Sequence, residues 1–454
     1  MNWVNDPNGL VYFDGEYHLF YQHNPFGAEW GNISWGHAVS RDLVRWERLP
    51  VAIAAEGDEA IFSGSAVVDH GNTSGFGTGR EPPLVAIYTS AYPTEQAQSL
   101  AYSTDRGRTW TKYPGNPVLR DAEPEFRDPK VFWHEPAGEW RMVVVKAVRR
   151  TVAIYASADL RTWTHLSDFA PAGAVGDVWE CPDLFPLGRR WVLVVSVNPG
   201  AIAGGSGMQY FVGEFDGTRF AADGGPRWLD HGRDYYAAVS WNGVPDGRRI
   251  MIGWMSNWEY AHALPPGRSA MSVAREIGLR ATGEGVELVQ RPVRELSGLH
   301  AGRAYRLRPR IVEPGVWRLT GSGAWGGKLD VEATFRLRDA ARFGLHVLAG
   351  GEERTVVGYD AAAQELYVDR TRAGDGAFSP GFAGVQRAPL PARRARVALR
   401  ILVDRTSVEV FSGQRAITDL VFPSSSSRAI RLFAEGGQVG LERLTIRRLR
   451  SAWR

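Results

Sequence analysis

Short runs of apolar residues, broken by turn-forming residues, recur along almost the whole chain. Each run has the length of a β-strand and is rich in Val, Ile, Tyr and Trp, and Gly, Pro, Asp and Asn separate the runs. Representative runs lie at residues 9–21, 84–90, 140–148, 191–197 and 250–254. The sequence has no long segment of helical periodicity. The pattern therefore predicts an all-β protein.

A repeated turn motif divides the first part of the chain. Ser-x-Asp followed by Trp begins at Ser40, Ser103 and Ser157, at offsets of 63 and 54 residues. In each copy we expect a strand before the motif and a new strand opened by the Trp. The offsets fit a four-stranded antiparallel blade with its loops, which is the repeat of a β-propeller. Three similar hairpins in a β-sandwich are the alternative that the repeat alone leaves open.

The repeat ends near residue 290. From about residue 305, strand-like segments continue without the Ser-x-Asp and Trp motif. At roughly 55–60 residues per blade, the repeat region holds five blades. We predict a five-bladed β-propeller over residues 1–290, a linker with one short helix over 291–304, and a β-sandwich over 305–454. The expected sandwich strands lie at 329–337, 343–348, 397–403, 407–411, 430–435 and 440–448.

The composition mainly excludes other classes of protein and partner. The 454 residues carry 53 Lys and Arg against 50 Asp and Glu, and a net charge of +3 gives no case for nucleic acid or an acidic membrane surface as partner. No apolar run approaches the ~18 residues that span a bilayer. The single cysteine, Cys181, excludes an intramolecular disulfide, and we expect it to be a small buried packing residue.

Localisation and assembly are less constrained than the fold. No signal peptide precedes the first motif, so a cytoplasmic protein and the trimmed mature form of a secreted protein both stay open. We expect a monomer.

Four polar clusters fall at the same phase of successive blades. They hold Asp6, Ser63, Asp128 and Glu180, at intervals of 57, 65 and 52 residues, and a further 55 residues lead to Tyr235. Inner strands of a propeller converge on its axis, so we expect the three carboxylates to face one another. Their mutual repulsion raises at least one pKa. One ionised and one protonated carboxyl group is the pair that glycoside hydrolysis needs.

The ordered motifs of the first 300 residues resemble those of glycoside hydrolase family 32, which comprises invertases, levanases, inulinases and related β-fructosidases. The segment 403–411 is similar to the β-sandwich of that family. The family fold, a five-bladed propeller followed by a β-sandwich, agrees with the pattern above. The motifs that carry the resemblance are Trp3-Val-Asn-Asp-Pro-Asn-Gly9, Phe20-Tyr-Gln22, Trp30-Gly31, Trp35-Gly-His37, Phe62-Ser-Gly-Ser65, Arg127-Asp-Pro129 and Glu180-Cys-Pro182.

The resemblance implies a role for each carboxylate. Asp6 would be the nucleophile that attacks the anomeric carbon of fructose, and Glu180 the acid/base. Asp128 would bind fructosyl hydroxyl groups and stabilise the oxocarbenium-like transition state. The implied mechanism is retaining double displacement, for which the Asp6 and Glu180 carboxyl groups lie about 5–5.5 Å apart.

The resemblance also implies a fructose pocket. One of Trp254 and Trp258 completes it, and their positions in the sequence do not decide between them. No metal or other cofactor is expected, because the spacing of His18, His23 and His37 matches no ligand pattern. The other implied pocket residues are Asn5, Gln22, Trp30, Phe62, Ser63 and Arg127.

The implied activity is release of terminal fructose from fructans such as levan and inulin, and from sucrose. The segments 21–26, 46–50 and 235–241 look most like exo-acting enzymes of the levanase and exo-inulinase type. The preferred substrate stays open. The alternatives are a fructosyltransferase on the same scaffold, a five-bladed hydrolase acting on arabinose or xylose, and a non-catalytic fructan-binding protein.

Overall fold

A computed structural model describes residues 2–79, 81–171, 173–265, 267, 269–283, 285–321 and 323–453. These residues form two compact units. The first consists of Met1–Trp228, Tyr236–Trp254 and Ser269–Glu287, and the second of Leu229–Tyr235, Met255–Arg268 and Leu288–Arg454. Among the described residues, helical structure is limited to short 3₁₀ turns, and no helix has the length and apolar character needed to cross a membrane. The 3₁₀ turns are η1 (Glu135–Ala137), η2 (Pro245–Gly247), η3 (Ala261–Ala263) and η4 (Arg294–Leu299).

In the described part of the first unit, the strands form successive antiparallel sheets, each built from consecutive strands of the chain. The first sheet contains β1 (Val4–Phe13), β2 (Glu16–His23), β3 (Ser34–Ser40) and β4 (Glu47–Ile53). The second contains β5 (Ala60–Val68), β6 (Leu84–Ala91), β7 (Gln96–Ser103) and β8 (Thr111–Lys112). The third contains β9 (Phe126–His134), β10 (Glu139–Lys146), β11 (Thr151–Ser157) and β12 (Thr164–Phe169).

The last two sheets each have one additional short strand. The fourth contains β13 (Val178–Leu187), β14 (Arg190–Asn198), β15 (Gly207–Phe215), β16 (Phe220–Ala222) and β17 (Arg227–Trp228). The fifth contains β18 (Tyr236–Ser240), β19 (Arg249–Met255), β20 (Ala270–Met271), β21 (Arg275–Thr282) and β22 (Gly285–Pro292).

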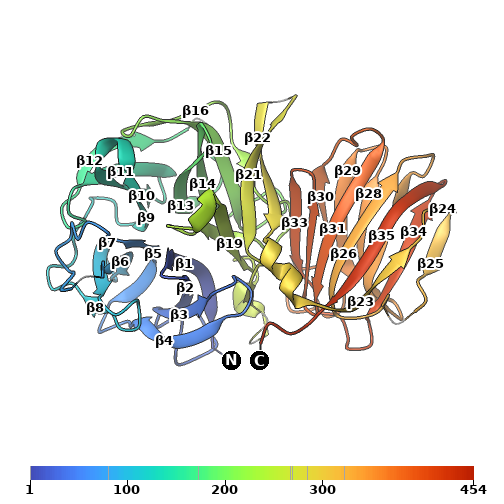
Figure 1. Cartoon of the computed structure of the whole chain (residues 1–454), viewed down its shortest axis with the longest axis horizontal. Helices are drawn as coiled ribbons and strands as arrows, with labels where there is room; N and C mark the ends of the chain where they lie inside the picture. Colours follow the sequence, from blue (N-terminus) through green and yellow to red (C-terminus); the bar gives the residue numbers. More distant parts are fainter. Residues whose placement is uncertain are drawn as a thin grey trace. The chain divides into compact units, whose positions relative to one another are not determined.

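The first strands of these sheets surround a common centre (Figure 1). Each inner strand lies next to the inner strand of the following sheet, in the order β1, β5, β9, β13 and β18, and β18 lies next to β1 again. The ring is closed by backbone hydrogen bonds from Tyr12 N–H to the Asn242 carbonyl and from Asn242 N–H to the Leu10 carbonyl. This arrangement confirms the predicted five-bladed β-propeller and excludes the reading of the repeat as hairpins of a sandwich.

The repeated Ser-x-Asp motif is the turn between the third and fourth strands of the first three blades. In the first copy, Ser40 ends β3, and the Asp42 carboxylate accepts the backbone N–H groups of Val44 and Arg45. The residue after each Asp has a positive φ, for example 59° at Leu43. The side chain thus satisfies the backbone of a tight turn that has few other hydrogen bonds. The Trp of each motif lies directly before the last strand of its blade.

Each inner strand of the propeller has an irregular pairing register with its neighbour. The pairing register shifts around Ser63 on β5, Asp128 on β9, Cys181 on β13 and Ala237 on β18. Three of these residues, Asp128, Cys181 and Ala237, have positive φ values of 65°, 46° and 50°. A bulge of this kind inserts an additional residue and redirects the neighbouring side chains. The irregularities therefore coincide with the polar clusters found in the sequence.

A buried ion pair connects the inner strands beyond these bulges. Lys130 Nζ lies 3.5 Å from Asp183 Oδ1 and also donates to the Ser240 carbonyl. The Asp183 carboxylate in turn accepts the Ser240 N–H at 2.6 Å. Burial lowers the pKa of Lys130, and Asp183 opposes that shift. The pair ties β9, β13 and β18 together, and removing one partner would leave an uncompensated buried charge.

The second unit contains a β-sandwich, as the sequence predicts. The longer sheet has the order β23-β35-β26-β31-β32-β33, with β24 also paired to β35, and the other has the order β25-β34-β27-β28-β29-β30. Alternate apolar residues of both sheets form one core. The strands of the longer sheet are β23 (His300–Leu307), β24 (Arg310–Val312), β26 (Lys328–Arg336), β31 (Arg396–Asp404), β32 (Ser407–Ser412), β33 (Arg415–Leu420) and β35 (Val439–Leu449). Those of the other sheet are β25 (Gly315–Arg318), β27 (Arg342–Gly350), β28 (Glu353–Asp360), β29 (Glu365–Arg372), β30 (Val385–Pro389) and β34 (Ala429–Glu435).

The connection between the two sets of strands is short. Strand β22 runs to Pro292 and β23 begins at His300, so strand structure extends into both ends of the segment 291–304. Only η4 and its flanking residues lie between, and Leu296 and Leu299 of η4 are buried.

A buried polar cluster holds the segments 229–235 and 255–268 within the second unit. Arg370 on β29 donates to Asp234 Oδ2 at 2.6 Å and to the Tyr260 hydroxyl at 3.0 Å. Tyr260 donates to Asp234 Oδ1 at 2.6 Å, and the Arg370 guanidinium lies 4.1 Å from the centre of the Phe382 ring. Each charged group in the cluster has a partner, which is the condition for burying charge without a large loss of stability.

Candidate active site

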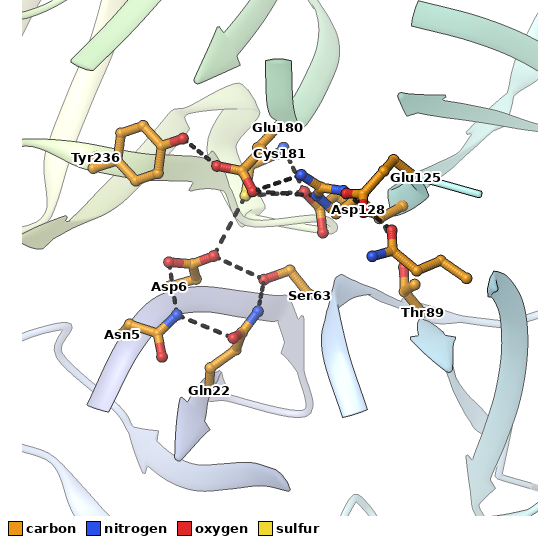
Figure 2. Close-up of polar contacts among 12 residues, drawn as sticks. Asn5, Asp6, Gln22, Ser63, Thr89, Glu125, Asp128, Glu180, Cys181 and Tyr236 are labelled. Atoms are coloured by element: carbon orange, nitrogen blue, oxygen red, sulfur yellow. Dashed lines mark hydrogen bonds and ion pairs between the residues drawn. The ribbon is translucent and has the colours of Figure 1, made fainter. Parts of the chain in front are cut away.

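Asp6 lies on β1 in a small cage of hydrogen-bond donors (Figure 2). Asn5 Nδ2 donates to Asp6 Oδ1 at 3.0 Å, and Ser63 Oγ donates to Asp6 Oδ2 at 3.1 Å. Gln22 connects these two donors, because its Oε1 accepts from Asn5 at 3.0 Å and its Nε2 donates to Ser63 Oγ at 2.6 Å. Trp3 Nε1 donates to Asn5 Oδ1 at 2.6 Å and so fixes the orientation of the Asn5 amide. The cage fixes the Asp6 carboxylate in one orientation.

Asp128 lies at the bulge of β9 and is held by groups from two neighbouring blades. Its backbone N–H donates to Thr89 Oγ1 at 2.9 Å, and Thr89 in turn donates to Gln98 Oε1 at 2.9 Å. Gln98 Nε2 donates to the Phe126 carbonyl on the same strand as Asp128. The Asp128 carboxylate accepts the backbone N–H of Cys181 at 2.9 Å. The positive φ of Asp128 is therefore supported by buried hydrogen bonds on both sides.

Glu180 lies on β13 and is less buried than the two aspartates, with a side chain that is 20% exposed. The Tyr236 hydroxyl donates to Glu180 Oε2. Arg127 lies 3.2 Å from Glu180 Oε1, through both Nε and a terminal nitrogen. Both carboxylate oxygens of Glu180 thus have a donor, and one edge of the group remains accessible.

Arg127 is itself fixed by groups on its far side. One terminal nitrogen donates to Gln96 Oε1 at 3.1 Å and pairs with the Glu125 carboxylate. Burial alone would lower the pKa of Arg127, but Glu180 and Asp128 raise it overall, so the guanidinium stays charged. A fixed positive charge therefore lies directly beside Glu180.

Cys181 lies between the two aspartates. Its Sγ is 3.6 Å from Asp128 Oδ2 and 3.7 Å from Asp6 Oδ2. Burial raises the pKa of the Cys181 thiol well above its usual value, and the nearby carboxylates raise it further, so the group is a neutral donor. Cys181 is buried, as the sequence predicts, but it also contacts the carboxylates and is more than a packing residue.

Burial and mutual repulsion shift the pKa values of both aspartates upward. The pKa of Asp6 rises to about 6, chiefly because the group is buried and then because Glu180 is near. The pKa of Asp128 rises to about 7 by burial and by Glu180, although Arg127 opposes the shift. These shifts follow from three carboxylates in one water-poor site. Perturbed carboxyl groups of this kind are typical of catalytic sites.

A small cavity lies at the bulges of the inner strands. Ser63, Asp128 and Cys181 line it directly. The other lining residues come from the positions at or near the bulges, namely Pro7, Asn8, Gly64, Pro129, Lys130, Pro182 and Val239.

Two aromatic residues from neighbouring blades lie together at a more exposed position. Trp30, in the loop between β2 and β3, is 43% exposed, and its ring centre is 6.1 Å from that of Phe62 on β5. Trp35 Nε1 donates to the Phe62 carbonyl at 2.9 Å and so fixes the backbone beside Ser63. The Trp30 and Phe62 rings offer apolar surface of the kind that contacts the C–H faces of sugars.

The two tryptophans left open by the sequence are placed differently. Trp254 on β19 is fully buried, and its contribution to the pocket stays a prediction. Its ring packs 6.5 Å from Tyr236 and 6.3 Å from Trp3, and Nε1 donates to Ser269 Oγ. Trp258 is half-buried in the second unit, near His262, and its contribution to the pocket stays a prediction.

Sequence reasoning missed two residues that hold the acidic residues in place: Tyr236, on the Glu180 carboxylate, and Thr89, on the Asp128 backbone N–H. The blade interval pointed to Tyr235, but Tyr236 is the residue whose hydroxyl donates to Glu180. Successive side chains of a strand point in opposite directions, so an error of one residue selects the wrong face. Thr89 was also missed, because it lies on the second strand of its blade and carries no motif of its own.

The histidines expected not to bind a metal have other partners. His18 Nδ1 lies 3.1 Å from His37 Nε2, and His23 Nδ1 lies 2.8 Å from the Trp3 carbonyl. Within the described ranges, no three His, Cys, Asp or Glu side chains are arranged to hold a metal ion.

Comparison with known families identifies the class of protein that this fold and site define. Residues 1–292 match the model of the glycosyl hydrolases family 32 N-terminal domain, and residues 313–448 match that of the glycosyl hydrolases family 32 C-terminal domain. The chain therefore belongs to glycosyl hydrolase family 32.

Individual relatives cover the whole chain. The levanase of Bacillus subtilis (strain 168) is 49% identical over 473 residues, which span 100% of this chain and 69% of that protein. The extracellular exo-inulinase of Aspergillus awamori is 42% identical, and its crystal structure superimposes with a TM-score of 0.94 over 100% of this chain and 97% of that chain. A β-fructofuranosidase from Schwanniomyces occidentalis, complexed with fructosyl-erythritol, has a TM-score of 0.89 at 32% identity, over 99% of this chain and 95% of that chain.

Proposed function

We propose that this protein is a retaining β-fructosidase that releases terminal β-D-fructose from fructans and sucrose. The observation that carries the proposal is the convergence of Asp6, Asp128 and Glu180, from three inner strands, in one mostly buried site of a family 32 chain. The similarity to proteins named levanase and exo-inulinase supports fructans as the substrate class.

Asp6 is the proposed nucleophile. Its donors, Asn5 and Ser63, hold the carboxylate in a fixed orientation, and its buried position excludes most of the water that would compete for the fructosyl group. In the first step an Asp6 oxygen attacks the anomeric carbon of fructose and forms a covalent ester. The bond to the leaving oxygen breaks at the same time.

Glu180 is the proposed acid and base. It is the most exposed of the three carboxylates, so it can reach both the leaving group and an incoming water molecule. In the first step it gives its proton to the leaving oxygen. In the second step it takes a proton from the water that attacks the anomeric carbon, and Asp6 is released as a carboxylate.

Asp128 is proposed to bind fructosyl hydroxyl groups and to stabilise the positive charge of the transition state. Its carboxylate is fixed by Cys181 N–H and its backbone by Thr89, so it needs no rearrangement when charge develops. A preorganised charge of this kind is often the largest contribution to catalysis. The proposed pocket around the sugar includes Asn5, Gln22, Trp30, Phe62, Ser63 and Arg127, with one of Trp254 and Trp258 as a further candidate.

The decisive experiment combines a substrate panel with an acid/base variant. We expect the wild-type protein to release free fructose from levan, inulin and sucrose, as measured by product chromatography. Glu180→Ala should lower kcat on sucrose by about 10²–10⁴-fold, the usual contribution of a general acid. Azide, which needs no general base, should intercept the fructosyl-enzyme of this variant and give fructosyl azide with retained configuration, although the first step still lacks its general acid.

The outcomes separate the alternative functions. Oligosaccharides longer than the substrate as the main products at high sucrose would show a fructosyltransferase. Binding of levan without turnover by the wild type would show a non-catalytic fructan-binding protein. Undiminished activity of Glu180→Ala would contradict the proposed mechanism.

A further inference from the structure

Arg370 is a buried charged residue that the proposed mechanism does not use. It lies on β29, and neither its side chain nor that of its partner Asp234 is exposed to solvent. Burial would lower the pKa of Arg370, but Tyr260, Asp234 and Asp419 raise it overall, so the guanidinium stays charged. A buried ion pair adds little stability compared with apolar residues of similar volume, so we looked for its contribution in the groups that it holds in place.

Arg370 connects two segments of the second unit to β29. The first segment is 229–235, in which the Asp234 carboxylate accepts from Arg370 Nη1 at 2.6 Å. The second segment is 255–268, in which the Tyr260 hydroxyl accepts from Arg370 Nη2 at 3.0 Å and donates to Asp234 Oδ1 at 2.6 Å. One planar guanidinium group therefore fixes both segments at the same time.

The first segment is also fixed along its length by β33. The backbone N–H of Asp234 donates to the Thr418 carbonyl at 3.0 Å, and the Asp234 carboxylate accepts the Leu420 N–H at 2.8 Å. Asp230 accepts the Thr418 N–H at 2.9 Å and the Thr418 hydroxyl at 2.7 Å. A Cβ atom at Gly232 would lie only 2.1 Å from the Thr418 carbonyl oxygen, so the backbone packs directly on β33. The position of this segment is therefore narrowly defined.

Both segments continue directly into residues that support the candidate active site. The first segment leads to Tyr236, the first residue of β18, whose hydroxyl donates to Glu180 (Figure 2). The second segment begins directly after Trp254, whose ring centre is 6.5 Å from that of Tyr236. It ends directly before Ser269, which accepts from Trp254 Nε1 at 2.5 Å and donates to the Val4 carbonyl at 3.2 Å. The groups that Arg370 fixes thus flank the partner of Glu180 in the chain.

We propose that Arg370 is a positioning residue for Glu180, and that it acts through Asp234 and Tyr236. The inference rests on the proposed hydrolase function. Only one residue separates Asp234 from Tyr236, and two residues of extended chain span about 7 Å, so the anchor defines where β18 begins. A displacement of about 1 Å in a catalytic group can cost up to roughly 10²-fold in rate, even when its cause lies far from the reacting atoms.

The test compares two chemically identical substitutions in the full chain. Arg370→Lys keeps the charge but lacks the planar group that reaches Asp234 and Tyr260 together. Arg400→Lys is the matched control, because Arg400 on β31 donates to the buried Asp330 carboxylate on β26 at 3.1 and 3.0 Å. Circular dichroism checks that each variant folds. If Arg370→Lys does not fold, Tyr260→Phe replaces it, since it removes the hydroxyl between the two anchored segments.

The kinetic readout separates positioning from a general loss of stability. At a temperature at which all variants are folded, Arg370→Lys should lower kcat on sucrose by about tenfold and change KM by less than about twofold, and Arg400→Lys should leave both close to wild type. Adding Arg370→Lys to Tyr236→Phe should lower kcat by less than about twofold further, because the contact that Arg370 supports is already absent.

A second readout does not depend on turnover. Hydrogen exchange, followed by mass spectrometry, reports how firmly each part of the backbone is held. In Arg370→Lys the amides of residues 229–240 should exchange at least about tenfold faster than in wild type. In Arg400→Lys the same amides should exchange at the wild-type rate.

Three results would overturn the proposal. Equal kcat in Arg370→Lys and wild type would show that Arg370 does not position Glu180. Losses of kcat that multiply in the double variant with Tyr236→Phe would show that Arg370 does not act through Tyr236. Unchanged exchange of residues 229–240 would show that Arg370 does not hold the first segment.

Failure of the proposed function would be recognised separately. A wild type without turnover of sucrose or levan would contradict the hydrolase function itself. In that case hydrogen exchange still decides whether Arg370 fixes the start of β18: faster exchange in Arg370→Lys alone would support the anchor, and equal exchange would refute it.

Discussion

At the residue scale, the chemistry of the site depends on what surrounds each carboxylate. Asp6 and Asp128 are buried and close to other carboxylates, which raises their pKa values to about 6 and about 7. Glu180 has the Tyr236 hydroxyl and the Arg127 guanidinium as partners and is partly exposed. Three groups of nearly the same chemistry therefore have different environments, which allows them different roles.

The contact between Tyr236 and Glu180 leads to a prediction about activity. In Tyr236→Phe the Glu180 carboxylate loses a donor that fixes its orientation, so sucrose hydrolysis should slow. The acidic limb of the kcat/KM profile follows Asp6 and Asp128, whose pKa values are about 6 and about 7, and it should stay in place. We expect kcat at the optimum to fall by about tenfold or more, the cost of losing a strong hydrogen bond. The measurement is the pH dependence of sucrose hydrolysis.

Tyr235→Phe is the matched control, because it removes a hydroxyl group one position earlier in the chain. Its pH profile should match that of the wild type. An unchanged kcat in Tyr236→Phe would show that Tyr236 does not position Glu180.

At the scale of elements, the bulges of the inner strands decide where the carboxylates lie. Asp128, the third residue of β9, has a φ of 65°, a conformation that costs energy for a residue other than glycine. Thr89 on β6 and Gln98 on β7 hold this bulge from the neighbouring blade. The position of Asp128 is thus maintained by the second and third strands of the preceding blade.

This support can be tested at Thr89. Thr89→Val keeps the shape of the side chain but leaves the buried Asp128 N–H without its acceptor, so the free energy of unfolding should fall by about 1–3 kcal/mol. The kcat/KM on sucrose should also fall, since the Asp128 carboxylate is no longer held in place. Denaturant unfolding and steady-state kinetics measure the two effects.

Thr89→Ser is the control, because it keeps the hydroxyl group. We expect Thr89→Ser to remain close to wild type in activity. If Thr89→Val and Thr89→Ser have the same stability and activity, the hydrogen bond does not support Asp128.

At the scale of the whole molecule, the buried carboxyl groups of the site lower the free energy of unfolding at neutral pH. A carboxyl group whose pKa is raised from 3.8 to about 7 binds more protons in the folded state than in the unfolded state between these values. The contribution of Asp128 to the free energy of unfolding is therefore most favourable below pH 3.8, and it is lost as the pH rises through about 7. The physical cause is burial of the Asp128 carboxyl group, and the nearby Glu180 adds to it.

Asp128→Asn should remove this effect. We expect the variant to have a higher unfolding temperature than wild type at pH 8, by a few degrees, with a difference that disappears near pH 4. Thermal unfolding across this pH range measures it, and activity should be lost. A difference that stays constant with pH would mean that charge is not the reason for the change.

Burial of a histidine has the opposite effect on the free energy of unfolding, because it lowers stability at acidic pH instead of at neutral pH. Burial lowers the pKa of His18 to about 4, so the folded state binds fewer protons than the unfolded state between 4 and 6.5. The contribution of His18 to the free energy of unfolding is complete above pH 6.5, and it is lost as the pH falls toward 4.

Much of the architecture and part of the site were predictable from the sequence. The alternation of apolar residues, the turn motifs and the blade-length intervals indicate the propeller, because these patterns depend on local geometry that each strand repeats. The same intervals brought Asp6, Ser63, Asp128 and Glu180 to the inner strands. Tyr236 was missed by one residue, because the bulge of β18 and the alternation of side chains cannot be read from an interval.

By itself, the sequence determined the all-β fold, the family and the identity of the carboxylates. Only the tertiary structure decided that Cys181 lies between two aspartates, that Trp254 is buried, and that Thr89 holds the backbone of Asp128. The physical reason is that these contacts join residues far apart in the chain, and their distances become fixed only when the ring of blades closes. Burial, which shifts the pKa values of the site, likewise exists only in the closed ring.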